Sequence, residues 1–409
     1  ISSHRRTIKT TEENCSLEGS QPPLEAYSLG CLIRLLAGIL IVAKKMCDNR
    51  KVIGYWISEK KRQKLNWSDF KRVCAKNGFT LIMIDINSNL DSQGPLDIFL
   101  HKLTDTLALA EYGDQNAKSI VSRIQEFIRK YSEMIVIDPL ENVTNLRNRH
   151  KCYKIIRNYV FTPNFVEFKS VDVQENLSLL TKKNVKFPFL CKPSLAHGST
   201  DAHKMMVIFN EDGLKDCQVP CVAQDFINHN AILYKVFVVG DKFHVVERPS
   251  LKNFYPKDCL TSNTIFFNSF DISKSGAKSK WSIISDDDKN LTVKPNFETF
   301  ERIVKSVAKA FGLILLGIDV VIENHTQKYA IIDVNVFPGY DGYPNFFEHL
   351  IDCMKNLIDQ KITRQNCHVN LNKCLNDDLD SGFESDEKRR TLTELRLSSN
   401  SVNDSPGAP

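Results

Sequence analysis

The 409-residue sequence predicts an α/β domain with a small, largely parallel sheet, followed by an α+β region with antiparallel sheets. In the first part, apolar strand-like segments alternate with amphipathic helices, which is typical of parallel sheets. In the second part, strands occur in close pairs around tight turns, which is typical of antiparallel hairpins. Apolar residues make up 42% and charged residues 25% of the chain, and these ordinary globular values exclude a collagen, a coiled coil and a polytopic membrane protein.

The parallel part is expected between about residues 46 and 145. Short apolar runs predict its strands, and apolar residues recurring every three or four positions predict its helices. Gly78 stands at a favoured position directly after the first helix. The predicted strands are residues 52–57, 80–86, 96–103 and 134–137, and the predicted helices are 66–77 and 115–131.

The antiparallel part begins with short predicted strands. Gly240-Asp241 has the composition of a two-residue hairpin turn. A later helix is expected to bury an apolar face that begins at Phe297 and to end at Gly312, and a final helix is expected to end near Ile358. The predicted strands are 188–191, 205–209, 221–226, 231–239, 242–247, 315–323 and 328–336, and the longer helix is 297–311.

The two ends of the chain differ in composition from the rest. Residues 29–43 are apolar around Arg34 but short for a membrane span, so residues 1–45 are interpreted as an atypical extension outside the core, with Met46 as the functional start. A membrane anchor is the alternative. The expected divisions are the extension 1–45, an α/β domain 46–145, a central domain 146–230, a C-terminal domain 231–362, and a disordered acidic tail 363–409.

Charge is unevenly distributed. The chain carries a net charge of +5, while residues 375–409 carry −4, residues 1–45 carry +2 and the middle carries +7. A basic middle suits nucleic acid, a membrane surface or phosphorylated small molecules. Nucleic acid is not expected as a partner, because no RNP motif, helix-turn-helix pattern or Lys/Arg run is present. The 12 cysteines are irregularly spaced without C-x-x-C, which argues against structural zinc and favours a reducing, cytoplasmic location.

The second hairpin places acidic side chains together. Its turn lies near His325-Thr326, so antiparallel pairing sets Asp319 opposite Asp333, and Asn335 lies two residues further on the same face. Oxygen atoms gathered in such apolar strands are costly unless a cation offsets their charge. Mg²⁺ favours carboxylate oxygens completed by phosphates and water. The alternative is the solvated face of a half-exposed hairpin.

Lys192 ends another apolar strand, and a loop rich in small residues follows it over 193–203. A lysine at this place can hold a phosphate as a point charge, and small residues let backbone N–H groups approach phosphate oxygens. Neither GxxxxGK[ST] nor GxGxxG occurs, so the P-loop and Rossmann alternatives fail. Each remaining cation near a strand end has a solvated explanation, but together they indicate a polyanionic ligand. These cations are Lys61, Lys102, Arg149, His197, His203, Lys235 and Arg248.

Seven segments, in order along the chain, resemble one family, the inositol 1,3,4-trisphosphate 5/6-kinases, also called inositol-tetrakisphosphate 1-kinases. They are VIGYWISEKK (52–61), QGPLDIFLHKLTD (93–105), FPFLCKPSLAHGS (187–199), QDFINHNAILYKVFVVGDKFHVVERPSLKNF (224–254), IFFNS (265–269), GIDVVI (317–322) and IIDVNVFPGYDG (331–342). The resemblance extends from about residue 51 to 358. It implies an ATP-grasp fold, with the N-terminal α/β domain on the inositol phosphate side and two antiparallel-sheet domains that clasp ATP.

The resemblance also implies roles for individual residues. Positions matching ATP contacts are Arg149, Lys192, Gln224, Asp225, Phe226, Ile227, Lys235, Ser250, Ser269 and Ser273. Positions matching inositol phosphate contacts are Lys61, His203, Lys235, Arg248, Asn335 and Gly339, with His197 and Lys102 as further candidates. Asp319, Asp333 and Asn335 match Mg²⁺ ligands, with two ions expected, and Lys192, Asp333 and Asn335 are the expected catalytic residues. The family loop before His203 is usually one residue shorter, and Asp225 stands where a vertebrate relative has Asn.

The implied activity is Mg²⁺-dependent transfer of the ATP γ-phosphate to hydroxyls of inositol tris- and tetrakisphosphates, which feeds higher inositol phosphate synthesis. This covers inositol 1,3,4-trisphosphate 5/6-kinase and inositol 3,4,5,6-tetrakisphosphate 1-kinase activities. We expect a monomer without stable membrane insertion. Two alternatives remain: an ATP-grasp ligase that joins a carboxylate to an amine, and a non-catalytic nucleotide-binding scaffold.

Overall fold

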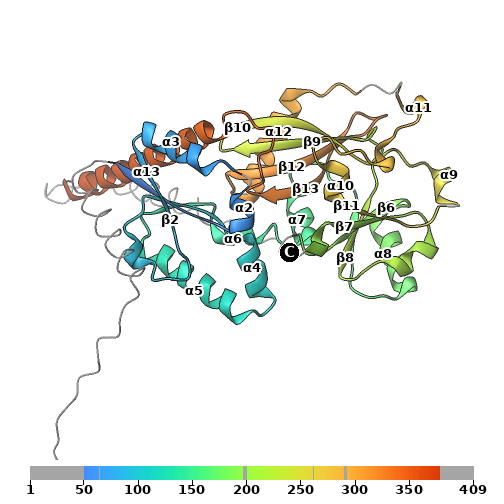
Figure 1. The fold of residues 1–409 in the computed structure, drawn as a ribbon, viewed down its shortest axis with the longest axis horizontal. Helices are drawn as coiled ribbons and strands as arrows, with labels where there is room; N and C mark the ends of the chain where they lie inside the picture. The colour runs from blue at the N-terminus through green and yellow to red at the C-terminus, as the bar shows by residue number, and fades with distance from the viewer. Residues whose placement is uncertain (1–49, 64, 197–199, 261, 290–292, 378–409) are drawn as a thin grey trace, which may run out of the picture.

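A computed structural model describes residues 50–377 except 64, 197–199, 261 and 290–292. Three sheets build this part of the chain: one parallel sheet of four strands, and two antiparallel sheets of five and four strands. Figure 1 shows the parallel sheet at the left, the five-stranded sheet at the lower right, and the four-stranded antiparallel sheet above and between them. Within the described residues, no helix is long and apolar enough to span a membrane. The expectations for residues 1–45 lie outside the described residues.

The N-terminal sheet has the order β2-β1-β3-β4, and all its strands are parallel, as predicted. Its strands are β1 (Lys51–Ile57), β2 (Phe79–Met83), β3 (Ile98–Lys102) and β4 (Ile135–Ile137). Helices α3 (Trp67–Lys76) and α5 (Gln115–Lys130) bury the apolar faces that their spacing predicts. Asn66 and Asp114 cap these helices with side-chain oxygens, which fixes where each helix begins.

The central sheet has the order β11-β7-β6-β8-β5 and is antiparallel. Its strands are β5 (Phe165–Phe168), β6 (Phe189–Pro193), β7 (Lys204–Ile208), β8 (Cys221–Asp225) and β11 (Ile265–Asn268). β5, β11, α7 (Arg149–Ile156) and α8 (Val173–Lys183) are additional to the elements predicted from sequence. Because β11 pairs with β7, this sheet includes residues beyond the boundary expected at residue 230.

The C-terminal sheet has the order β10-β9-β12-β13. It joins both predicted hairpins, β9 (Ile232–Val239) with β10 (Lys242–Pro249), and β12 (Leu315–Ile322) with β13 (Tyr329–Val336). Helix α12 (Phe297–Phe311) buries Phe300, Ile303 and Val307. Phe297 is 64% exposed, so the prediction that it faces the core is wrong. It is the first residue of the helix, where the chain only begins to approach the core.

The last helix, α13 (Phe346–Asp377), is longer than predicted. The expected end near Ile358 and the expected disorder of residues 363–377 are wrong. No Gly or Pro interrupts this segment, so no helix-breaking residue ends the helix earlier. Lys361 and Gln365 also contact Glu133 of the N-terminal domain, which holds the helix beyond Ile358 against the protein. The rest of the expected tail, residues 378–409, lies outside the described residues.

The remaining helices are short and connect these layers. They are α2 (Glu59–Arg62), α4 (Thr104–Glu111), α6 (Leu140–Thr144), α9 (Pro256–Cys259), α10 (Ser269–Ser273) and α11 (Asp286–Lys289). The 3-10 helices are η1 (Asp91–Gln93), η2 (Thr200–His203), η3 (Glu211–Asp216) and η4 (Lys280–Ser282). Two of them bear on the site below, because η2 ends at His203 and α10 begins at Ser269.

Candidate active site

Three charged side chains form a row across the C-terminal sheet. Asp319 on β12 pairs with Lys235 on β9 and with Asp333 on β13. The predicted pairing of the two aspartates is therefore confirmed. The row depends on a β-bulge, because the register of the hairpin shifts by one residue between Asp319 and Val320. Ile332 is the extra residue: in a regular ladder continued from the Val320–Ile331 pair, Ile332 rather than Asp333 would stand opposite Asp319.

Charge in this row is only partly balanced. Lys235 Nζ lies 3.2 Å from Asp319 Oδ1, and Arg149 Nη2 lies 3.9 Å from Asp333 Oδ2. Burial raises the pKa of the Asp319 carboxyl, Lys235 opposes this shift, and the nearby Asp333 charge adds to it. The contact of Asp319 Oδ1 with Lys235 is an ion pair without good hydrogen-bond geometry, so this buried oxygen keeps an unused acceptor position.

A magnesium ion fits this donor set. Asn335 pairs with Gly317, next to the Asp319–Asp333 pair, so its side chain lies on the same face of the sheet. Two carboxylates, one of which has the buried unused acceptor Asp319 Oδ1, and one amide oxygen match the oxygen ligands that Mg²⁺ prefers. The described residues contain no cluster of three His, Cys, Asp or Glu side chains that could hold a metal by themselves. The set therefore suits an open site that substrate phosphates and water complete, rather than a closed structural one.

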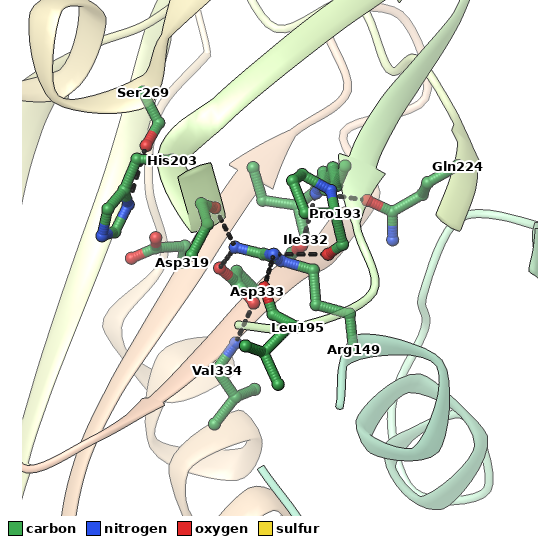
Figure 2. A network of polar contacts seen from close by, with 12 residues as sticks. Arg149, Pro193, Leu195, His203, Gln224, Ser269, Asp319, Ile332, Asp333 and Val334 are labelled. Atoms are coloured by element: carbon green, nitrogen blue, oxygen red, sulfur yellow. Dashed lines mark hydrogen bonds and ion pairs between the residues drawn. The ribbon is translucent and has the colours of Figure 1, made fainter. Parts of the chain in front are cut away.

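Lys192 lies on β6 of the central sheet and faces the bulge. Its side chain is almost fully buried, and its Nζ donates to Gln224 Oε1 at 2.7 Å, to the Ile332 carbonyl at 2.8 Å and to the Tyr153 hydroxyl at 3.2 Å. Figure 2 shows Gln224 and Ile332 in this network, beside Asp333. Burial lowers the pKa of Lys192 to about 8, although Asp333 favours the charged form. The bulge thus aligns Asp333 and also presents a carbonyl group to Lys192.

Two residues of this region were not found from the sequence. Tyr153 on α7 donates its hydroxyl to the Ile332 carbonyl at 2.7 Å and accepts from Lys192. His229 Nδ1 lies 2.5 Å from the Ile227 carbonyl oxygen, and its Nε2 lies 2.7 Å from Ser250 Oγ. Burial lowers the pKa of His229 to about 4, so the ring is neutral, its Nδ1–H donates to Ile227 and its Nε2 accepts from Ser250. A tyrosine in a helix and a histidine in a loop carry no local signal of such roles.

The segment after β8 contains the other positions that the resemblance implies for ATP. Gln224 is fully buried, and its Nε2 has no hydrogen-bond partner among the described residues. Asp225 accepts a hydrogen bond from the Lys186 N–H at 2.7 Å, and burial raises its pKa. Phe226 and Ile227 are half-buried at the start of the loop to β9, and Ser250 follows β10 directly.

The loop after β6 meets helix α10 at His203. His203 Nδ1 lies 3.3 Å from Ser269 Oγ, and the His203 ring lies 4.0 Å from the ring of Phe270. Figure 2 shows His203 and Ser269 on the same side of the site as Asp319. Ser273 is half-buried at the end of the same helix. His197 lies outside the described residues.

The remaining implied substrate residues approach from two other places. Arg248 on β10 donates to the Asp341 carbonyl at 2.6 Å, in the segment that contains Gly339. Lys102 donates to the Phe337 carbonyl, two residues before Gly339. Lys61 on α2 instead lies within the N-terminal domain, 2.7 Å from Asp105 and 3.1 Å from Thr104. The structure thus brings Lys192 and Arg149 close to the row Lys235–Asp319–Asp333. Lys61 lies apart from them, in the N-terminal domain.

Comparison with known proteins agrees with this geometry. Residues 52–143 match the model of the inositol 1,3,4-trisphosphate 5/6-kinase pre-ATP-grasp domain. Residues 156–356 match the model of the inositol 1,3,4-trisphosphate 5/6-kinase ATP-grasp domain. The two models together cover the parallel sheet and both antiparallel sheets described above.

Curated relatives carry related names. The chain is 39% identical over 320 residues to the inositol-tetrakisphosphate 1-kinase of Danio rerio, which covers 76% of this chain and 80% of the relative. It is 39% identical over 318 residues to the enzyme of the same name from Xenopus laevis, with the same coverage. It is 29% identical over 325 residues to inositol-tetrakisphosphate 1-kinase 1 of Arabidopsis thaliana, covering 77% of this chain and 98% of the relative.

The solved structures that match this chain are more distant in sequence. D-alanine–D-alanine ligase from Bacillus anthracis is 13% identical with a TM-score of 0.46, covering 78% of this chain and 98% of that one. The macrocyclase MdnC bound with its precursor peptide MdnA from Microcystis aeruginosa is 12% identical with a TM-score of 0.47, covering 75% and 99%. The family assignment rests on the sequence matches. The chain therefore belongs to the inositol 1,3,4-trisphosphate 5/6-kinase family and is an inositol phosphate kinase with the ATP-grasp fold.

Proposed function

We propose that this kinase transfers the γ-phosphoryl group of ATP to ring hydroxyls of inositol tris- and tetrakisphosphates. The observation that carries the proposal is the row Lys235–Asp319–Asp333, with Asn335 beside it and the buried ammonium of Lys192 facing it across the bulge. Acidic ligands for a cation and separate cations for phosphates are what phosphoryl transfer requires, because the reaction depends on positioning and charge stabilisation.

Asp319, Asp333 and Asn335 would hold Mg²⁺. The ion would supply a Lewis acid that neutralises the charge of the β- and γ-phosphates. We propose two ions, since two carboxylates and an amide offer more oxygen atoms than one phosphate-bound ion needs. Metal analysis of the enzyme with a non-hydrolysable ATP analogue would count them, and one ion per chain would contradict this part of the proposal.

Lys192 serves the phosphate side of ATP in this proposal. Its ammonium group already uses its three N–H donors on Gln224, Ile332 and Tyr153, so a phosphate oxygen must replace one of these acceptors. The Tyr153 hydroxyl is the most distant of the three, at 3.2 Å. A preorganised buried cation stabilises charge that develops on the transferred group without solvent reorganisation. The ATP-facing positions proposed from family resemblance are Arg149, Lys192, Gln224, Asp225, Phe226, Ile227, Lys235, Ser250, Ser269 and Ser273.

His203, Lys235 and Arg248 serve the acceptor in this proposal. They come from η2, β9 and β10, so they can approach one ring from different sides. Gly339 lies beside them in the segment that Arg248 and Lys102 hold, and Asn335 lies at the metal side. Lys61 would join from the N-terminal domain, where Asp105 now neutralises it. A ring with three or four phosphates needs several such cations.

The test is incubation of the enzyme with labelled ATP and a panel of inositol tris- and tetrakisphosphates, followed by positional analysis of the products. We expect Mg²⁺-dependent label on the ring of inositol 1,3,4-trisphosphate and inositol 3,4,5,6-tetrakisphosphate. ATP turnover only with amino acids would instead identify a ligase, and ATP binding without any turnover would identify a scaffold. We also propose a cytoplasmic monomer. Free buried cysteines such as Cys74, Cys152 and Cys191 support the compartment, because cysteines stay reduced in the cytoplasm. Sedimentation of the purified chain tests the monomer.

A further inference from the structure

Arg149 holds both ends of one loop. The side chain begins at the first residue of α7 and is 3% exposed. Its Nη1 donates to the Pro193 carbonyl at 2.7 Å and the Leu195 carbonyl at 3.0 Å, where the loop leaves β6. Its Nη2 donates to the Ala202 carbonyl at 3.1 Å, where the loop returns. Figure 2 shows the guanidinium between the two loop-entry residues and Asp333.

The backbone beside Arg149 holds only the entry of this loop. The Arg149 N–H donates to the Ser194 carbonyl at 2.9 Å, and the Ala196 N–H donates to the Arg147 carbonyl at 2.8 Å. The entry would therefore keep its place without the guanidinium. Among the described residues, the bond from Arg149 to Ala202 joins the return of the loop to α7.

The residue after Ala202 is His203. Strand β7 holds the chain on the other side of His203, because Lys204 pairs with Asn268 of β11. We infer that Arg149 is a positioning residue for the acceptor substrate, because it fixes the backbone directly before His203. This inference rests on the proposed function, in which His203 contacts the inositol phosphate. The His203 ring itself lies against the exposed ring of Phe270 and 3.3 Å from the Oγ of Ser269, which lies on the side away from Arg149 in Figure 2. The role goes beyond the contact with ATP that family resemblance implies for Arg149.

The shape of the guanidinium, not only its charge, is what these contacts use. Both terminal nitrogens donate to carbonyl oxygens that lie in different directions, and Asp333 receives only a distant contact of 3.9 Å. A lysine would keep the charge, but its single nitrogen cannot occupy the two positions that Nη1 and Nη2 hold, so at least one end of the loop would lose its hydrogen bond. A residue that serves ATP simply as a cation would tolerate this exchange better.

The test is therefore Arg149→Lys, with Arg147→Lys as the matched control. The Arg147 side chain is also cationic and largely shielded from solvent, with 11% exposed, but it contacts Leu107 and Glu111 in the N-terminal domain. We expect Arg149→Lys to raise the KM for the inositol phosphate about tenfold, the scale of losing a charged hydrogen bond. The control should leave this KM within about twofold of the parent enzyme. A rise confined to the KM for ATP would overturn the inference.

Combination with His203→Ala shows whether Arg149 acts through His203. In the His203→Ala background, Arg149→Lys should change the acceptor KM by less than about twofold, since the group it positions is gone. If Arg149→Lys and His203→Ala instead raise the acceptor KM independently, so that their effects multiply in the double variant, the inference is overturned. Thermal unfolding identifies folded variants first, and Arg149→Gln repeats the cycle if the lysine variant does not fold. If the parent enzyme has no kinase activity, the proposed function fails. If the parent is active and the cycle is multiplicative, only this inference fails.

Discussion

The two hairpins of the C-terminal sheet carry opposite charges on different backbones. β9–β10 pairs without interruption from Lys242–Val239 to Pro249–Ile232 and presents the cations Lys235 and Arg248. β12–β13 contains the bulge at Ile332 and presents Asp319 and Asp333. Long cationic side chains reach a ligand from a regular strand, because their flexible stems absorb small errors of position. An aspartate has one methylene, so the backbone itself must place it, and the bulge does this.

The largest effect should come from removing an acid of the irregular hairpin. Asp333→Ala should lower kcat by a hundredfold to a thousandfold, on the order of the loss seen when one preorganised charge-stabilising group is removed. The fold should survive, because removing one of two adjacent carboxylates also removes the repulsion between them. Steady-state kinetics and thermal unfolding check both statements. Asp241→Ala, at the turn of the regular hairpin, is the control and should keep normal kcat; near-normal turnover of Asp333→Ala would contradict the metal assignment.

The second effect concerns Lys192, which the bulge carbonyl holds. Its pKa of about 8 in the folded enzyme lies below the value of 10.5 for a free lysine. Between these values the unfolded chain binds a proton that the folded chain has lost, so stability should rise with pH. Compared with Lys192→Met, the unfolding free energy of the parent should rise by up to about 3 kcal/mol between pH 8 and pH 10.5. Denaturant titrations at several pH values measure the unfolding free energy of both proteins. If the two free energies change with pH in parallel, the lowered pKa of Lys192 is contradicted.

The third effect should separate the regular hairpin from the chemistry. Gly240 has φ +62°, and a Cβ there would lie 2.7 Å from Cys353 Sγ. Gly240→Ala should lower the unfolding free energy by about 2 kcal/mol, from left-handed backbone strain and this clash. Turnover per folded molecule should stay unchanged, since the change lies at the far end of β9 from Lys235. Denaturant titration measures the unfolding free energy, and steady-state kinetics measure the turnover. A loss of kcat in the folded variant would show that the two hairpins are coupled.

The smallest effect should come from a cation of the regular hairpin. Arg248→Ala should raise the KM for the inositol phosphate about tenfold and change the KM for ATP less, because one of several cations is lost. Lys242→Ala, on the same strand but paired with Asp352 at the surface, is the matched control. Initial-rate kinetics with each substrate varied would distinguish them. A change limited to ATP would reverse the role proposed for Arg248.

Much of the site could be predicted because its signals are local. The turn near His325 fixes the register of the second hairpin to within one residue, so spacing could bring Asp319 and Asp333 together, while the bulge at Ile332 that places them opposite each other has no signal in the spacing. The end of an apolar strand identified Lys192. Tyr153 could not be found in this way, since its partner Ile332 lies 179 residues away and is a backbone carbonyl, which no side-chain pattern reveals.

The helices and strands also divide into those that local sequence signals predict and those that depend on distant contacts. Helices α3 and α5 and the strands of the parallel sheet follow apolar periodicity, which is a property of a short segment. β5 and β11 are short and lie at the two edges of the central sheet, so they depend on their single neighbours β8 and β7. The length of α13 depends on Glu133 and on the lack of helix breakers, while the predicted end relied on composition alone.

The sequence by itself determined the family and the closeness of the two acids on the second hairpin, because both follow from contiguous residues. The bulge that sets the acids opposite each other belongs to the tertiary structure. Only the tertiary structure decided that the two hairpins form one sheet, which places Lys235 beside Asp319. It also decided that Lys192 meets the bulge carbonyl and that Arg149 joins the two ends of a loop. These contacts join buried groups that are distant in the chain. They form only when burial removes water and each donor must find the acceptor that the fold brings to it.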